Sequence, residues 1–153
     1  MRIDVKGLDV VKQNLGRFSK QFPSHLIKRL TQDIHDKTVK KASKHTKTGV
    51  MESNISLEVK GDKGRVYIEN SGMLVNWKSK PVNYAVFVHF GTRPHKILPK
   101  KRKALRWSSS DVFHFAKVVN HPGYKGDPFM YDSAKEVFNN LNKIAKEVFN
   151  DTK

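Results

Sequence analysis

The stretch YAVFVHFGTRPHKILPKKRKALRW, residues 84–107, decides the fold of this chain. Its apolar first part stops at Gly91, and the residues after it carry seven Lys or Arg and no acid. The apolar part can be buried and can anchor the basic segment, whereas Gly91, Pro94 and Pro99 disfavour a regular helix or a central strand. We therefore predict a long basic loop, residues 92–107, that projects from a packed body toward something anionic.

Length and composition indicate one domain. With 153 residues, of which 37% are hydrophobic, the chain is long enough to bury a core of its own. We expect a single domain over residues 1–153, with helices over about 7–47, strands and the basic loop over about 50–125, and a C-terminal helix over about 128–150.

The net charge of the chain indicates an anionic partner, and its lack of cysteine excludes thiol chemistry. The formal net charge of +16 favours nucleic acid, an anionic membrane face or an acidic protein as partner. The chain has no cysteine, which excludes disulfides, thiolate zinc sites and a thiol nucleophile. The first residues lack the apolar core of a signal peptide, and no run of about 18 apolar residues is present. We expect a soluble protein without a membrane partner.

The spacing of apolar residues changes along the chain from helical to strand-like and back. Spacings of three and four predict two N-terminal helices, separated at Pro23, and one long C-terminal helix after residues 127–128, which would supply its N-cap and first-turn proline. Alternation over residues 55–59 and 65–69, around a turn at 61–64, predicts a β-hairpin. Residues 113–120 read as a strand, and residues 84–90 fit a buried strand and a short buried helix equally well. The fold class is α+β, a small and mainly antiparallel sheet packed with helices at both chain ends.

We find no enzyme in this sequence. His89, His95, His114 and His121 lie close in the sequence, but no pair has the spacing of a helical zinc motif, and Asp111 is the only acid between Asn70 and Asp127. Histidines held locally in turns or in the core are the simpler interpretation, with no metal and no cofactor. Aromatic residues around the basic loop could stack on nucleic-acid bases, although burial as core and loop anchors is favoured; they are Trp77, Tyr84, Phe87, Phe90, Trp107, Phe113 and Phe115.

Two phrases, residues 84–107 and FAKVVNHPGYKGDPF at 115–129, resemble the tail-component family of lambda-like siphophages, which comprises neck and tail-completion proteins. The N-terminal third fits loosely, with Gly7 and Leu8 opening an amphipathic helix and Thr48-Gly49 closing the helical region. His89 stands where such proteins often have a glutamate. The motif positions in this chain are Tyr84, Ala85, Phe90, Gly91, Thr92, Arg93, Pro94, His95, Ala104, Leu105, Trp107, His121, Pro122, Gly123, Pro128 and Phe129.

The resemblance implies a structural virion protein that forms a closed ring, a hexamer, at the head–tail junction or the tail end. Its partners would be its own copies, neighbouring neck and tail-tube proteins, and genomic DNA passing through the lumen. The basic loop would reach a neighbouring subunit or ring, anchored by Phe90 and by Leu105 and Trp107. The alternative is that Trp107 returns to the core of its own subunit. The expected contact residues are Arg93, Lys96, Lys100, Lys101, Arg102, Lys103, Arg106 and Trp107.

A second function class stays open on the residues alone. The basic loop could act as a phosphate clamp in a nucleic-acid-binding module that does not read sequence. A ring component should form a closed oligomer, whereas such a module should bind DNA as a monomer or dimer.

Overall fold

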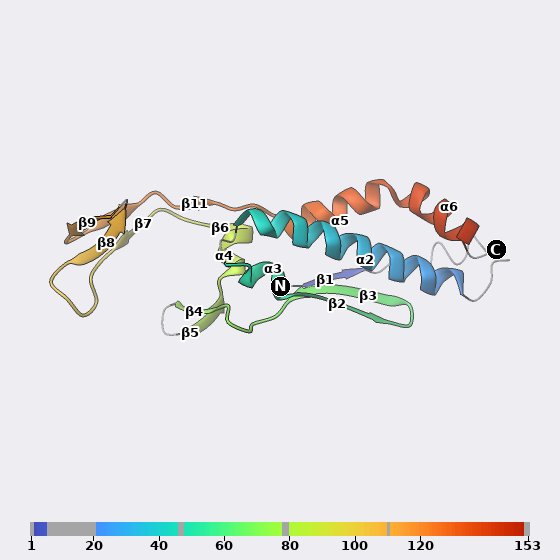
Figure 1. Ribbon diagram of the computed structural model, residues 1–153, viewed down its shortest axis with the longest axis horizontal. Helices are drawn as coiled ribbons and strands as arrows, with labels where there is room; N and C mark the ends of the chain where they lie inside the picture. Colours follow the sequence, from blue (N-terminus) through green and yellow to red (C-terminus); the bar gives the residue numbers. More distant parts are fainter. Residues whose placement is uncertain (1, 6–20, 46–47, 78–79, 110, 152–153) are drawn as a thin grey trace.

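The computed structural model of the protein describes residues 2–5, 21–45, 48–77, 80–109 and 111–151. These residues form an elongated molecule, with helices and a sheet making a body at one end and a narrow β arm at the other (Figure 1). The combination of helices with small antiparallel sheets confirms the predicted α+β class.

The sheet of the body has three antiparallel strands in the order β1-β3-β2: β1 (Arg2–Val5), β2 (Ile55–Lys60) and β3 (Lys63–Ile68). The predicted hairpin is β2 and β3, with Ile55 opposite Ile68 and Lys60 opposite Lys63. Because residues 60 and 63 pair, the turn is only the two residues Gly61 and Asp62, shorter than expected. Alternation places the apolar residues of both strands on the face that carries the helices.

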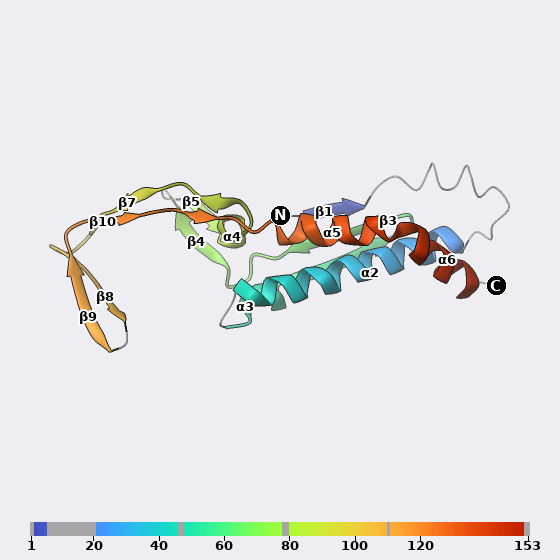
Figure 2. The same cartoon turned by 90° about the horizontal axis from the view of Figure 1, so that it is seen from above.

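Three helices pack together on that face. Helix α2 (Phe22–Ala42) contacts β2 and β3 and runs beside α5 (Phe129–Asn139) and α6 (Leu141–Asp151), as Figures 1 and 2 show. Pro23 stands in the first turn of α2, where its missing N–H costs no hydrogen bond. The buried residues of α2 follow the predicted spacing and are Phe22, Leu26, Ile27, Leu30, Thr31, Ile34, Thr38 and Ala42.

The predicted boundaries of the N-terminal helices need correction. Helix α2 ends at Ala42, and the 3-10 turn η1 (Ser43–His45) follows, so the helix stops before Thr48-Gly49. Gly49 instead precedes the short helix α3 (Val50–Ser53) in a left-handed conformation. The first predicted helix, with Gly7 and Leu8, lies outside the described residues.

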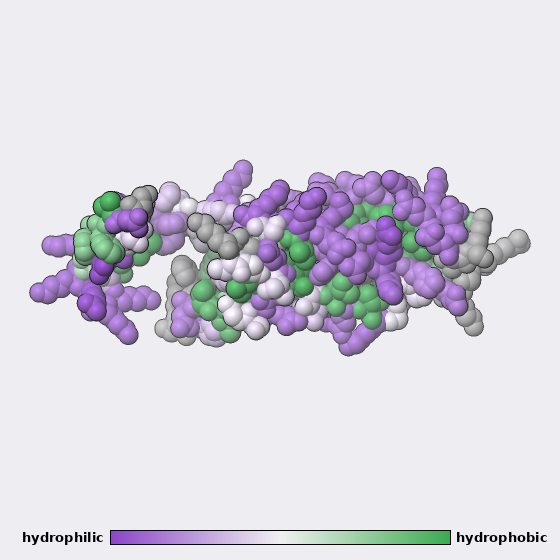
Figure 3. Space-filling model, viewed as in Figure 1, coloured by the Kyte–Doolittle hydropathy of each residue, from purple (hydrophilic) through white to green (hydrophobic). Residues whose placement is uncertain are grey.

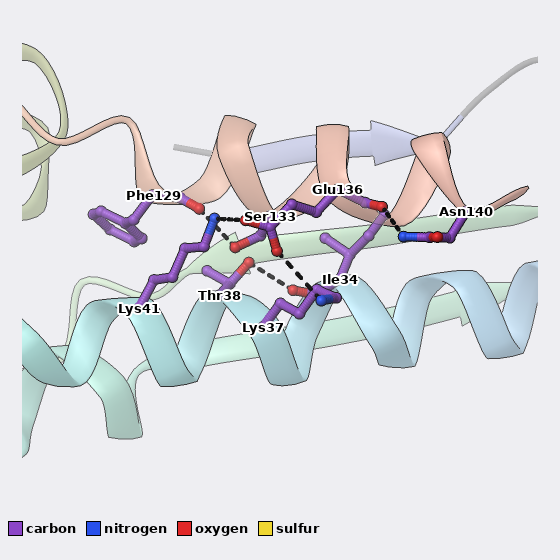
Figure 4. Close-up of polar contacts among 8 residues, drawn as sticks. All are labelled: Ile34, Lys37, Thr38, Lys41, Phe129, Ser133, Glu136 and Asn140. Carbon is purple, nitrogen blue, oxygen red and sulfur yellow. Dashed lines mark hydrogen bonds and ion pairs between the residues drawn. The ribbon is translucent and has the colours of Figure 1, made fainter.

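Polar side chains fasten α5 to α2. Glu136 of α5 accepts hydrogen bonds from Lys37 and Lys41 of α2, at 3.3 and 2.5 Å (Figure 4). These hydrogen bonds hold the pKa of Glu136 below its usual value, and the one from Lys41 contributes most. In the same contact, the buried hydroxyls of Thr38 and Ser133 donate back to carbonyls of their own helices, so neither is left without a partner (Figure 4).

The long C-terminal helix is divided in two at Asn140, and two predictions about it were wrong. The helical spacing of apolar residues after Phe129 includes Phe138 in the buried stripe, but Phe138 is 41% exposed, because it lies about 100° around the helix from the buried Val137. Asp127 does not cap α5: Pro128 is the N-cap residue, and no side chain bonds to the cap. The Asp127 carboxylate lies against His45 instead.

Between body and arm lie a small hairpin and a short helix. Strands β4 (Leu74–Trp77) and β5 (Lys80–Asn83) pair with each other, and helix α4 (Ala85–Phe90) follows. The side chain of Asn83 accepts from the N–H of Ala85 at 2.9 Å and donates to the Glu69 carbonyl at 2.9 Å, so it starts the helix and ties it to the end of β3. The ambiguous residues 84–90 are thus a helix. Within the described residues, no helix combines the length and apolarity that crossing a bilayer requires.

The arm, residues 91–125, consists of six short strands that pair across its length. From the body outward, β6 (Gly91–Thr92) pairs with β11 (Tyr124–Lys125), β7 (His95–Ile97) with β10 (Val119–His121), and β8 (Leu105–Ser109) with β9 (Val112–Ala116). The predicted strand 113–120 is therefore two strands, β9 and β10, which belong to different pairs. The β8–β9 pair, the tip hairpin, turns across the direction of the rest of the arm (Figure 2).

Candidate interaction site: the basic arm

The arm leaves the body at Gly91, where the backbone permits only glycine. Gly91 comes directly after the last residue of α4 and has φ 78°, a region that other residues rarely adopt. A Cβ at this position would collide with the backbone carbonyl of Tyr124 on the opposite strand. The glycine that stops the apolar run therefore also lets the two strands of the arm approach each other.

Two prolines interrupt the arm at the same level. Pro94 lies between β6 and β7, and Pro122 lies opposite, between β11 and β10. Neither proline has an N–H to donate, so the ladder of hydrogen bonds is broken on both strands at once. The expected projecting loop is thus a two-stranded ribbon in its first half, and residues 98–104 are its longest stretch without strand structure.

Next to this interruption lies an apolar pocket of about 600 Å³, which we call the base pocket. Its walls are built mainly by Phe87 and Val88 of α4, by Ile97 and Tyr124 of the arm, and by His95 and His121. The rings of these two histidines, which face each other across β7 and β10, stack with centroids 4.9 Å apart. His45 and Thr92 complete the lining, which contains no Lys, Arg, Asp or Glu among the described residues.

Each histidine of the base pocket has a hydrogen-bond partner, local in the sequence for His95 and His121 and distant for His45. The Nδ1 atom of His121 accepts from the N–H of Gly123 at 3.0 Å, and Nδ1 of His95 lies 2.9 Å from the Arg93 carbonyl. His45 binds the Asp127 carboxylate through Nε2 at 2.7 Å, and its Nδ1 lies 3.4 Å from the Tyr124 hydroxyl. His45 thereby connects the end of α2 to both ends of the segment that joins the arm to α5.

His89 is the buried histidine at the root of the arm. It is 1% exposed, and both ring nitrogens lack a hydrogen-bond partner within the described part of the chain. Aromatic rings of Phe90, Phe129 and Tyr131 surround it edge-on. Burial lowers the pKa of His89, because a charged imidazolium would lose its hydration there. His89 was expected to be hydrogen-bonded locally, and this expectation was wrong.

All seven basic residues of the predicted contact set are exposed: Arg93, Lys96, Lys100, Lys101, Arg102, Lys103 and Arg106. Four of them are consecutive, residues 100–103, in the part of the arm without strand structure. Pro99 and Leu105 border a hollow of about 460 Å³ whose charged lining comes from Lys100, Lys101, Arg102 and Arg106, with no acid among them. This hollow can accept an anionic group such as a phosphate or a carboxylate.

The tip hairpin exposes aromatic side chains on both faces. One face carries Arg106, Phe113 and Phe115, with the Arg106 guanidinium 3.9 Å from the centre of the Phe113 ring. The other carries Trp107, which stacks on His114 directly opposite at 5.4 Å. A two-stranded hairpin has no second layer to cover either face, so Phe115 is 67% and Trp107 43% exposed.

Two expectations that aromatic residues are buried were therefore wrong. Phe90, expected to be buried as an anchor of the loop, is 60% exposed, although one side of its ring contacts His89 and Tyr131 at the root of the arm. The preference for buried aromatic residues also fails at Phe113, Phe115 and Trp107, because the arm extends away from the core. Tyr84 lies half-buried against the core of the body, and Phe87 is half-buried in the wall of the base pocket. The side chain of Trp77 is outside the described part of the chain.

The structure brings the two resembling phrases together. Gly91 lies opposite Lys125 and Thr92 opposite Tyr124, so residues 84–107 and 115–129 form the two sides of one arm. Sequence reasoning missed the pairing of His95 with His121, the participation of His45 and the base pocket itself. The tip hairpin had a usable signal, since residues 105–107 and the mainly apolar residues 112–116 flank the polar run at 108–111, which is typical of a β-hairpin turn.

Among the described residues, no group of three His, Asp or Glu side chains is placed to hold a metal ion. No protein-family model matches this chain, and neither a curated protein nor a solved structure matches it.

Proposed function

We propose that this chain is a structural virion protein of a tailed bacteriophage, acting as one subunit of a closed ring at the head–tail junction or the tail end. The ring is a hexamer through whose lumen the genomic DNA passes. Two features support this proposal: the resemblance of residues 84–107 and 115–129 to phage tail components, and the chemistry of the arm that these residues form.

The exposed apolar surface of the arm is the observation that carries the proposal. Of thirteen large hydrophobic residues that are exposed within the described residues, eight lie in the arm, so the apolar surface is concentrated there. A two-stranded ribbon is marginal in water without a partner, and exposed apolar patches mark protein–protein contacts. An arm of this kind serves a subunit whose final state is an assembly with its own copies and neighbouring proteins.

The charge of the chain fits a position beside DNA or an acidic ring. A ring repeats the charge of +16 in every subunit, so the copies repel one another unless an anionic partner lies nearby. The basic residues 100–103 face solvent next to the apolar tip and could neutralise such a partner. In this arrangement the apolar surface holds the neighbouring protein and the basic surface selects for negative charge.

The oligomeric state tests this proposal. We expect the purified chain, alone or mixed with neck and tail-tube proteins, to form a closed ring of fixed mass by light scattering and of uniform shape by electron microscopy. A chain that stays monomeric in both settings and does not attach to tails would contradict the proposal.

A second candidate function, nucleic-acid binding without sequence preference, is favoured by the basic hollow beside Lys100 and Arg106. In that case the chain binds duplex DNA as a monomer or dimer, and its affinity falls steeply with salt. The exposed aromatic residues could then stack on unpaired bases. Binding of a monomer to DNA, with no ring in the presence of phage proteins, would select this function over the first.

A further inference from the structure

The base pocket has the properties of a receptor for an apolar side chain. Its volume of about 600 Å³ lies within the range of roughly 300–1,000 Å³ that is common for binding sites. Phe87, Val88, Ile97 and Tyr124 supply apolar walls, and the stacked rings of His95 and His121 close one side. No charged Lys, Arg, Asp or Glu lies among its described lining residues, so an incoming aromatic ring would not displace a solvated charge.

The tip hairpin has the complementary properties. Phe113 and Phe115 lie on the same face of β9 and are 56% and 67% exposed. Within residues 105–116 the charge of Arg106 is balanced by that of Asp111, so the hairpin is formally neutral although the chain carries +16. Figure 3 shows this hydrophobic cluster at the end of the arm, with hydrophilic side chains projecting beside it.

Charge repulsion between copies favours contact through these two surfaces. Two chains of charge +16 repel each other, and the repulsion acts over a Debye length of about 8 Å at physiological salt. Contact between copies is least costly where both surfaces are uncharged and apolar. The base pocket meets both conditions. The tip face that carries Phe113 and Phe115 also carries Arg106, whose single charge is balanced by Asp111 within the hairpin.

In the observed conformation the tip hairpin does not reach the base pocket of its own chain. The paired strands β7 and β10 continue outward from the pocket, and the tip hairpin lies beyond them at the far end of the arm (Figures 1 and 2). A tip that enters a pocket on another copy makes a head-to-tail contact, in which the two copies use different surfaces. Such contacts close into rings when the rotation between copies permits.

We infer that the tip hairpin of one copy, through Phe113 and Phe115, docks into the base pocket of the next copy. This inference rests on the proposed function and specifies the contact between subunits of the ring. In this arrangement the basic residues 100–103 stay outside the base pocket when Phe113 and Phe115 dock. They therefore remain available to a different partner. The arm would thus hold its own neighbour with apolar side chains and an anionic partner with its lysines.

Single cysteines can locate the contact, since the chain has none of its own. Ser108→Cys places a thiol on the docking face of the tip, opposite Phe113, and Thr92→Cys places one in the base pocket. Under mild oxidation, a mixture of these two full-length variants should form the mixed disulfide as its main product. Ser71→Cys, at an exposed turn of the body, is the matched control and should form little disulfide with Ser108→Cys. A predominance of Ser108→Cys homodimers would indicate tip-to-tip pairing and overturn the inference.

Charge substitutions provide an independent test. Phe115→Asp places a charge on the docking face of the tip, and Ile97→Asp places one in the wall of the base pocket. Each substitution lowers the positive net charge of the chain, so weaker assembly could not come from stronger repulsion between copies. Each variant alone should lose self-association by roughly 10- to 100-fold, the effect of no longer burying one large apolar side chain. Mixed together, they should stop at a one-to-one dimer, because only one tip and one pocket remain intact.

The controls separate this inference from the proposed function. Leu74→Asp, at a residue 52% exposed on β4, should assemble like the unmodified chain. If the unmodified chain forms rings and both arm variants do so equally well, the docking contact is wrong and the proposed function stands. If the unmodified chain forms no oligomers and the two cysteine variants form no mixed disulfide, both are wrong. Melting curves of all variants establish that the body remains folded.

Discussion

The buried ring of His89 meets the ring of Phe129 edge to face, with centroids 5.3 Å apart and an interplanar angle of 77°. This contact joins α4, from which the arm departs, to the start of α5 in the body. The ring of His89 also meets that of Tyr131 edge to face, with centroids 4.6 Å apart. Burial lowers the pKa of His89, while the carboxylates of Asp127 and Asp132 act in the opposite direction and only partly offset it. Burial at the root of the arm therefore favours the neutral form of the His89 imidazole.

The first prediction concerns pH. The pKa of His89 is lower in the folded chain than in the unfolded one, where it is about 6.5. As pH falls below about 6.5, the unfolded chain binds a proton that the folded chain does not, so the free energy of unfolding decreases. We expect the melting temperature to drop between pH 7.5 and pH 5 by less in His89→Phe than in the unmodified chain. His25→Phe, at an exposed position of α2, should leave the drop unchanged. Equal drops in all three proteins would contradict this assignment.

The second prediction concerns the core. Ile34 is fully buried between α2 and its neighbours, so Ile34→Ala should destabilise the fold by about 2–5 kcal/mol through the cavity that it leaves. Phe138→Ala, at a residue 41% exposed, should cost clearly less. Chemical denaturation of both variants measures the difference, and a larger loss for Phe138 would mean that α5 packs on another face.

The third prediction concerns the root of the arm. Gly91→Ala forces a Cβ against the Tyr124 carbonyl and a φ of 78° on an alanine, so it should displace the arm and weaken assembly. The body should keep its melting temperature, because its core lies elsewhere. Gly61→Ala has positive φ but open space around it, and it should cost some stability without affecting assembly. Rings of normal mass from Gly91→Ala would show that the arm does not need this backbone.

The fourth prediction concerns the basic residues. Replacing Lys100, Lys101, Arg102 and Lys103 by Gln lowers the formal net charge from +16 to +12 and should leave folding intact. We expect weaker attachment to the neck or tail and fewer heads joined to tails. Any DNA binding should be insensitive to sequence, and its salt slope should fall by up to about 0.9 for each phosphate that the variant no longer neutralises.

The matched control for this variant removes the same charge from the helices, at the exposed Lys28, Lys135, Lys143 and Lys146. It should assemble normally. Normal virion yield from the variant of residues 100–103 would refute the role assigned to these residues and shift the weight of assembly to the helical faces.

The fifth prediction concerns amide exchange along the arm. Residues 95–97 pair with β10, whereas residues 98–104 have no strand structure, so exchange in the isolated subunit should be slower in the first segment than in the second. Assembly should slow exchange around Phe113 and Phe115 on the tip. Slow exchange through 98–104 before assembly, measured by mass spectrometry, would show that this segment is already ordered by contacts within the subunit.

The body was largely predictable because its signals are local. Alternation in β2 and β3 and the helical spacing in α2 each depend on neighbours within a few residues, and burial has the same periods. The break at Asn140 and the exposure of Phe138 were not predictable, since an apolar residue at the margin of a stripe is buried only if another element covers it.

The sequence by itself determined the α+β class, the projection of a basic segment after Gly91 and the excess of positive charge. Only the tertiary structure decided that residues 92–97 and 119–125 form one ribbon, because strand pairing depends on contacts between residues far apart in the chain. That pairing creates the base pocket, brings His45 to Asp127 and places Phe115 where nothing in its own subunit covers it. The same aromatic residues that would form a core in a compact domain become a contact surface here, because the arm carries them beyond the reach of the body.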